Sequence, residues 1–308
     1  MTERSAGTTG REAAHGRAEH RRGLLFALAA FGFWGLIPIY FKAVGSVPPL
    51  EILAHRVVWS VPLVALLIPL FGSWGGVREA LRSRKTLATL ALSATLVAAN
   101  WLTFIFGVTR GRILETSLGY YVNPLVNVLL GVIFLRERLT RLQAASVALA
   151  AAGTIHLTLS YGALPWISLT LAFTFGLYGL LRKTVRIDSM GGLLVETSLL
   201  FPAAAIYLAV LGARGASSLG TGGLGISALL VAAGAVTALP LIWFASAARR
   251  LPYSVIGLCQ YLSPSLTFLL AVLHYGERFT RAHAVAFACI WTALAILTFD
   301  MVHARRAG

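Results

Sequence analysis

Residues 121–148 read YVNPLVNVLLGVIFLRERLTRLQAASVA, and residues 261–288 read YLSPSLTFLLAVLHYGERFTRAHAVAFA. The two stretches align without gaps at an offset of 140 residues, and 11 of 28 positions are identical. They share a Tyr-x-x-Pro and a Glu-Arg-x-Thr-Arg at the same spacing, which two unrelated apolar segments would not usually share. The sequence therefore predicts an internal repeat.

The first apolar span of each half repeats as well, at an offset of 141 residues. The matching pairs are Gly35 with Gly176, Lys42 with Lys183, and Val44 with Val185. Each half then holds five spans, and an odd number makes the second half cross the membrane in the opposite direction. Such inverted repeats typically surround a substrate site near the bilayer midplane.

The composition indicates that lipid is the solvent for most of the 308 residues. Apolar residues make up 57% and charged residues 12%, with mean hydropathy +0.79. Soluble domains carry about 25% charged residues. The net charge of +15 reflects basic residues between apolar spans rather than a basic face for nucleic acid, so no nucleic-acid partner is expected.

Ten stretches approach the roughly 20 apolar residues needed to cross a bilayer, which predicts an all-α polytopic membrane protein. They are Gly23–Val44, Ile52–Phe71, Thr86–Val108, Ile113–Leu135, Leu142–Ser160, Ala163–Leu181, Gly191–Leu211, Gly225–Ala247, Tyr253–Tyr275 and His283–Met301. The predicted organisation is a disordered tail over 1–22, five-helix repeats over 23–160 and 161–301, and a C-terminal tail over 302–308. With both tails cytoplasmic, 19 Lys and Arg residues lie inside and 7 outside, as the positive-inside rule requires.

Two polar stripes follow matching spans of the halves. The first comprises Thr116, Tyr120, Asn123 and Asn127, and at the same offset the second comprises Ile256, Gln260, Ser263 and Thr267. Under a two-fold relation they would face each other or a common cavity and line the substrate path. The alternative is that they supply hydrogen bonds between helices. Pro124 and Pro264 sit beside the stripes, where proline can bend a helix.

Other side chains qualify for the path because polar and aromatic groups within a span need a reason to be there. Asn100 is a lone amide in the middle of the third span. The aromatic candidates are Trp34, Trp101, Tyr121, Tyr178, Trp243 and Tyr261. Core packing is the competing interpretation for these rings.

Glu51 and His55 lie four residues apart on one helix face, with Arg56 adjacent. Buried together, they could form a proton-titrating pair for ion coupling. At the membrane surface the same residues would form only a solvated pair of little energetic weight. Neither cysteine has the spacing of a metal site, so no metal and no cofactor are expected.

The polar and aromatic residues of several segments also resemble those of RarD-type EamA proteins, which belong to the drug/metabolite transporter superfamily. The similar segments are Glu51–Arg56, Asn100–Leu102, Ser117–Asn127, Leu135–Arg138, Gly179–Lys183, Gln260–Pro264 and Tyr275–Glu277. The resemblance implies a ten-helix permease of the bacterial inner membrane that exports metabolites or drug-like compounds. By similarity, Tyr121, Asn123, Pro124, Gln260 and Tyr261 would lie on cavity-lining helices.

These observations predict a secondary transporter working by alternating access, with the bilayer and a small-molecule substrate as partners, as a monomer or homodimer. The chain lacks a phosphate-binding Gly-x-x-x-x-Gly-Lys-Ser/Thr loop, so it is not by itself an ATP-driven pump. It also lacks a His-Glu-x-x-His motif, and no enzymatic activity is expected. A non-transporting membrane receptor or scaffold is the alternative.

Overall fold

A computed structural model describes residues 3–71, 74–135, 140–161, 164–248, 250–251 and 259–306, and its regular elements there are all helices. The helices are α1 (Glu3–Ala43), α2 (Pro49–Phe71), α3 (Trp74–Arg82), α4 (Arg84–Thr109), α5 (Ile113–Leu135), α6 (Arg141–Tyr161), α7 (Trp166–Thr184), α8 (Ser189–Ala213), α9 (Ser218–Thr221), α10 (Gly223–Ala248), α12 (Leu262–Leu269), the π-helical turn η1 (Leu270–His274) and α13 (Arg281–Arg306).

Eight of the described helices are long and apolar enough to cross a membrane. Two shorter apolar helices, Trp166–Arg182 and Leu262–His274, correspond to the sixth and ninth expected spans. The start of the ninth expected span, residues 253–258, lies outside the described residues. Because lipid offers no partner to backbone amides, helices of this length and composition make the chain a polytopic membrane protein.

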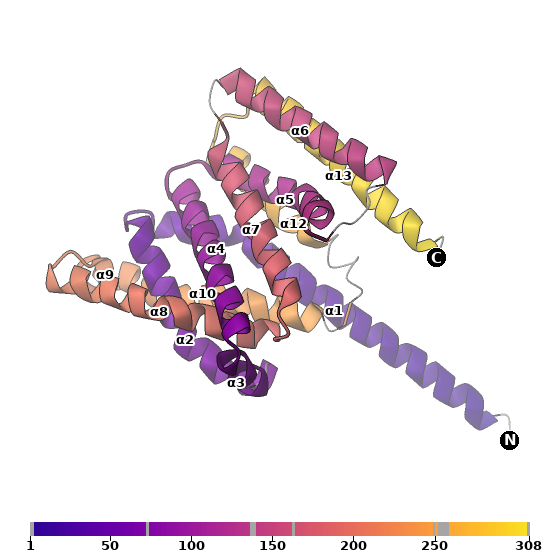
Figure 1. Ribbon diagram of the computed structural model, residues 1–308, viewed down its shortest axis with the longest axis horizontal. Coiled ribbons are helices and arrows are strands. Elements are labelled where there is room, and N and C mark those ends of the chain that lie inside the picture. The colour runs from indigo at the N-terminus through magenta and orange to yellow at the C-terminus, as the bar shows by residue number, and fades with distance from the viewer. Residues whose placement is uncertain are drawn as a thin grey trace.

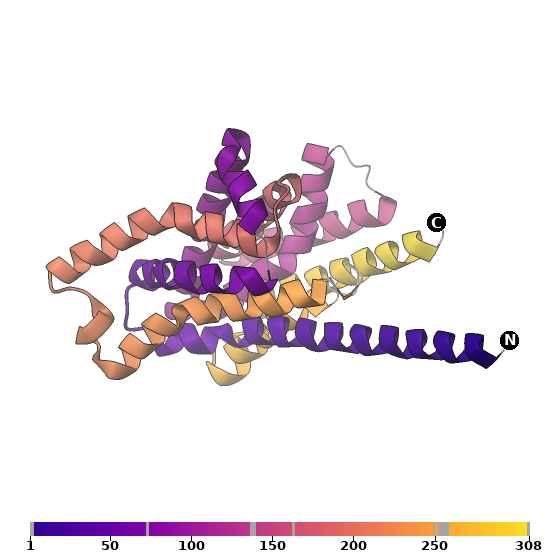
Figure 2. The same cartoon turned by 90° about the horizontal axis from the view of Figure 1, so that it is seen from below.

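The N-terminal segment differs from the expectation of disorder over residues 1–22. Helix α1 begins at Glu3 and runs without a break through the first span to Ala43 (Figures 1 and 2). Extending an existing helix avoids the unfavourable nucleation step, and the Ala, Glu and Arg residues of this segment favour the helix. The polar part of α1 therefore projects beyond the bundle.

Helices from the two halves of the chain interleave (Figure 1). Helix α1 packs against α10 and α12, whereas α7 packs against α4 and α5. Helix α2 packs against α8, and α6 lies side by side with α13 at one edge of the bundle (Figure 1). The core is thus shared between the halves, and any site inside it takes residues from both.

Small residues allow some of these helices to approach closely, as is common in membrane bundles. A β-carbon at Gly234 of α10 would lie 2.5 Å from the carbonyl oxygen of Trp59 on α2. A β-carbon at Gly119 of α5 would lie 2.8 Å from the carbonyl oxygen of Ser168 on α7. Both contacts join the first half of the chain to the second.

Candidate functional site

A buried arginine occupies the interior where α2, α4 and α10 meet. Arg56 on α2 is 8% exposed, and its Nε donates a 2.8 Å hydrogen bond to Oγ1 of Thr237 on α10. Its guanidinium lies over the ring of Trp101 on α4, with 4.1 Å between the guanidinium carbon and the ring centroid. A charge this deep in a membrane protein is costly, which marks the position as a functional candidate.

Asn100 links three helices beside Arg56. Its Nδ2 donates to the carbonyl oxygen of Leu171 and to Oγ1 of Thr174 on α7, both at 3.0 Å. Its Oδ1 accepts a 3.2 Å hydrogen bond from the hydroxyl of Tyr120 on α5. Tyr120 retains some accessible surface, whereas Asn100 is 1% exposed. Tyr40 of α1 interacts electrostatically with Arg56, and its hydroxyl donates a 2.9 Å hydrogen bond to the carbonyl oxygen of Leu229 on α10. We call Tyr40, Arg56, Asn100, Trp101, Tyr120, Thr174 and Thr237 the central cluster.

A second buried polar group surrounds Glu196 of α8, which is fully buried. Ser93 of α4 donates a short hydrogen bond to Oε1 of Glu196, and the hydroxyl of Tyr178 donates to Oε2 at 3.4 Å. Nε of Arg182 lies 3.7 Å from the same carboxylate. These residues form the Glu196 cluster, which joins α4, α7 and α8.

Aromatic rings connect the two clusters. The ring centroid of Phe175 lies 6.1 Å from that of Tyr120 and 5.9 Å from that of Tyr178. On the other side, the ring of Tyr120 lies 5.7 Å from that of Phe104. Phe175 therefore packs between the two clusters, in ring contact with one tyrosine of each.

Glu51 and His55 are buried, at 0% and 2% exposure, rather than solvated. The Glu51 carboxylate accepts hydrogen bonds from the Ser218 amide at 2.6 Å, the Ser218 hydroxyl at 2.8 Å and the Ser217 hydroxyl at 3.3 Å. His55 Nε2 lies 3.9 Å from Glu51, too far for a hydrogen bond. Both ring nitrogens of His55 lack a hydrogen-bond partner within the described part of the chain. Protonation of the ring would supply a charge beside Glu51.

Members of both predicted stripes form hydrogen bonds between helices. In the first stripe, Nδ2 of Asn123 donates to the carbonyl oxygen of Ala172 on α7 at 3.0 Å, and Asn127 donates to Asn123 at 3.3 Å. In the second, the Thr267 hydroxyl donates to the carbonyl oxygen of Gly35 on α1 at 3.2 Å. The stripes therefore join α5 to α7 and α12 to α1. These are hydrogen bonds between helices, as the alternative interpretation expects, and a common cavity for the two stripes stays a prediction.

The remaining members of the stripes and the two prolines lie as follows. Thr116 bonds within its own helix, to the carbonyl oxygen of Ile113 at 2.7 Å. Gln260 and Ser263 are half-buried near the start of α12. Pro264 lies in the first turn of α12, where a helix tolerates proline, and α5 continues through position 124. Ile256 lies outside the described residues.

Most of the predicted aromatic residues pack against other rings. Trp34 contacts Phe31 and Phe244, with centroids 5.5 and 5.9 Å away, and Trp243 contacts Phe33 at 5.8 Å. The Tyr121 hydroxyl lies 2.6 Å from the Ser265 hydroxyl, and Tyr261 is the N-cap residue of α12. Trp101 and Tyr178 are the two that contact the buried polar clusters.

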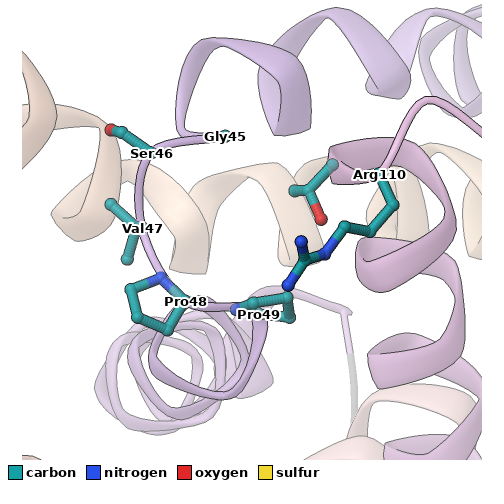
Figure 3. Close-up of a pocket in the computed structure, with 7 residues that line it drawn as sticks. Gly45, Ser46, Val47, Pro48, Pro49 and Arg110 are labelled. Carbon is teal, nitrogen blue, oxygen red and sulfur yellow. The ribbon is translucent and has the colours of Figure 1, made fainter.

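A small cavity of about 310 Å³ lies at the end of the bundle where α1 meets α2 (Figure 3). It is lined by Gly45, Ser46, Val47, Pro48, Pro49, Thr109 and Arg110. The Arg110 side chain extends toward Pro49 across this cavity (Figure 3). Arg110 thus places a positive charge at the surface, at the same end of α2 as Glu51.

Sequence reasoning missed Glu196, Arg182, Tyr40 and Thr237 as site residues. Glu196 carried a signal, because a carboxylate within an apolar span needs a partner. The other three gave none, since their roles depend on contacts between distant segments. Among the described residues, no group of three or more His, Cys, Asp or Glu side chains could hold a metal ion.

Comparison with known proteins decides the family. The profile of the EamA-like transporter family matches residues 21–159. An uncharacterized transporter of Vibrio cholerae is 48% identical over 288 residues, covering 94% of this chain and 95% of that protein. The protein RarD of Salmonella typhi is 47% identical over 286 residues, covering 93% and 97%. The chain is a RarD-type member of the EamA-like transporter family.

The EamA relationship establishes the chain as a membrane transporter, in agreement with its apolar helices. A solved structure described only as "Crystal structure of protein" has the same fold, with a TM-score of 0.58 and 19% identity. The match covers 90% of this chain and 97% of that one. The central cluster and the Glu196 cluster therefore lie inside a transporter fold.

Proposed function

We propose that this EamA protein is a secondary transporter that exports a small metabolite or drug-like compound by alternating access. The central cluster carries the proposal. It draws Arg56, Asn100 and Tyr120 from the first half of the chain, and Thr174 and Thr237 from the second. A substrate held there would contact both halves, so a relative movement of the halves would change its exposure.

The packing of the helices supports two inverted five-helix halves and ten spans as part of this proposal. The contacts of α1 with α10 and α12 have counterparts in the contacts of α7 with α4 and α5. Each of the pairs α2–α8 and α6–α13 contains one helix from each half, so exchanging the two halves leaves these pairs unchanged. A pseudo-two-fold relation accounts for this reciprocity and for the sequence repeat.

Two carboxylates connect the halves at one end of the bundle and fit the role of a gate. Glu51 of the first half binds Ser218 of the second. Glu277 of the second half accepts hydrogen bonds from the amides of Ile113 and Leu114 at 2.7 and 2.8 Å. Each carboxylate thus holds backbone amides of the other half, and opening this end requires these bonds to separate.

Proton coupling is the second part of the proposal, with His55 as the titrating group. The Glu51 carboxylate already accepts hydrogen bonds from three donors of Ser217 and Ser218. The ring nitrogens of its neighbour His55 have no hydrogen-bond partner among the described residues, and protonation of the ring would create an ion pair with Glu51. In proteoliposomes, an imposed pH gradient should drive flux in the native protein and not in His55→Gln. Flux that ignores the gradient in both proteins would rule out coupling.

The distribution of basic residues supports insertion in the bacterial inner membrane with both termini cytoplasmic. Nineteen of the 26 Lys and Arg residues lie in segments that would then face the cytoplasm. The end that carries Glu51 and Glu277 would face outward. Reporter fusions at the C-terminus and in the 214–222 loop would test this orientation directly.

Metabolite profiling of spent medium tests export. Cells producing the native protein are compared with cells producing Asn100→Ala, which removes the hydrogen bonds between α4, α5 and α7. Arg84→Gln, an exposed change on α4, is the matched control for insertion level. We expect one class of compounds to accumulate outside with the native protein and the control only. Identical media for all three would favour import or a non-transporting receptor or scaffold instead.

A further inference from the structure

Arg56 is a buried cation without a carboxylate partner in the described structure. We propose that it binds the carboxylate of the transported molecule, so that the substrate is a small organic monocarboxylate. This inference rests on the proposed transport function and adds the chemical class of the substrate.

The contacts of the guanidinium leave part of it free for a ligand. Nε is engaged by the Thr237 hydroxyl, and one face of the group is covered by the ring of Trp101. The two terminal Nη groups make no hydrogen bond to any residue that the structure describes. A planar fork held by its Nε and one face is preorganised for a bidentate carboxylate.

The described carboxylates near the interior are engaged elsewhere. Glu51 binds Ser217 and Ser218, and Glu196 binds Ser93, Tyr178 and Arg182. The ionisable groups that interact electrostatically with Arg56 are the phenols of Tyr120 and Tyr40. An uncompensated charge in a low-dielectric interior is unfavourable, and an anionic substrate would supply the missing countercharge.

The count of charges favours a monocarboxylate over a phosphate ester. The central cluster offers one positive charge, which a single carboxylate balances. A phosphate monoester carries about −1.5 to −2 at neutral pH and would leave excess negative charge buried. The half-buried rings of Tyr120 and Phe175 lie next to each other beside the cluster, where they could contact the apolar remainder of the molecule.

The surface cavity provides a second positive charge near the start of α2. Arg110, the C-cap residue of α4, extends toward Pro49 (Figure 3). Arg56 lies seven residues beyond Pro49 along α2, about 10 Å by the rise of a helix. Arg110 is exposed and stacks near Phe106, 5.7 Å from the ring centroid. A cation at the surface and another in the interior would attract an organic anion toward the central cluster.

Equilibrium binding to the purified full-length protein in lipid nanodiscs tests the inference without requiring transport. Radiolabelled benzoate and phenylacetate are the probes, and the unlabelled acids, their neutral amides and phenyl phosphate are the competitors. We expect at least one acid to bind and to be displaced by its unlabelled form, whereas the matched amide should compete at least about tenfold more weakly.

Variants of the arginine complete the test. Arg56→Gln should weaken binding of the acid at least about tenfold and remove its preference over the amide. Arg56→Lys keeps the charge without the planar fork and should retain part of the affinity. Arg84→Gln, an exposed arginine on α4, should bind like the native protein. Because the acid–amide comparison uses native protein, it remains decisive even if Arg56→Gln fails to fold.

Several outcomes would overturn the assignment. They are equal competition by acid and amide, native-like binding by Arg56→Gln, tighter competition by phenyl phosphate, or no binding of either acid. Binding without flux in proteoliposomes would refute the transport function and leave the carboxylate site intact. Flux confined to neutral compounds would support the transport function and refute the carboxylate site.

Discussion

The contact between Glu51 and the α8–α10 connection gives a sharp energetic prediction. Glu51 is fully buried, and its two oxygens accept hydrogen bonds from both the amide and the hydroxyl of Ser218. Glu51→Gln keeps the size of the side chain but turns one oxygen into a donor and removes the charge. One of the two Ser218 donors then loses its acceptor.

The expected cost follows from the strength of hydrogen bonds to charged groups, about 1.5–3 kcal/mol each. Taking about 2 kcal/mol for Glu51→Gln, local opening around Ser218 becomes about 30-fold more frequent. Hydrogen–deuterium exchange of peptides covering residues 214–222 should therefore accelerate by about that factor, because opening exposes the amide to exchange.

Glu115→Gln is the matched control. Glu115 pairs with Arg112, the residue just before α5, and its side chain is 21% exposed. Such a pair contributes about 0–1 kcal/mol, so exchange in residues 214–222 should stay unchanged. If Glu51→Gln also left exchange there unchanged, the carboxylate would not be holding the connection, and the proposed gate would lose one of its two contacts.

Three further changes test other parts of the structure. Gly234→Ala should lower the thermal unfolding temperature, since its β-carbon meets the Trp59 carbonyl oxygen and overpacking costs about 1–3 kcal/mol. The control Gly179→Ala has open space around its β-carbon and should leave that temperature unchanged. Equal unfolding temperatures for the two variants would contradict the close approach of α2 and α10. Arg56→Met should leave the unliganded protein as stable as before or more stable, because it removes a buried charge that has no carboxylate partner among the described residues. A clear loss of stability would mean that Arg56 is structural. Glu277→Gln should accelerate exchange in the first turn of α5, measured by mass spectrometry, and unchanged exchange would exclude the cap.

The sequence alone predicted that lipid surrounds most of the chain, that its apolar stretches form helices, and that the chain contains an internal repeat. Apolar stretches of about 20 residues are a local property, so the helices α2, α4, α5 and α8 begin and end near their predicted bounds. The short helix α9 was not predicted, because its four residues carry no apolar pattern and its amide is held by Glu51, far away in sequence.

Site residues were predictable to the extent that a single span revealed them. Asn100 and Arg56 stand out because a polar or charged side chain inside an apolar span needs compensation. The partners that compensate them, Thr174 and Thr237, are ordinary threonines in the sequence. Arg56 and Thr237 are 181 residues apart, and the helical periodicity of either segment says nothing about that contact.

The sequence by itself determined that this chain is a helical membrane protein, because hydropathy is read one segment at a time, and its repeat spacing predicts two related halves. Only the tertiary structure decided which polar side chains meet. In that structure Asn123 and Thr267 of the two stripes bond α7 and α1, and the Nη groups of Arg56 have no described partner. Glu196 is enclosed by Ser93, Tyr178 and Arg182. These contacts depend on how helices from both halves pack, and that packing is set by the whole bundle at once.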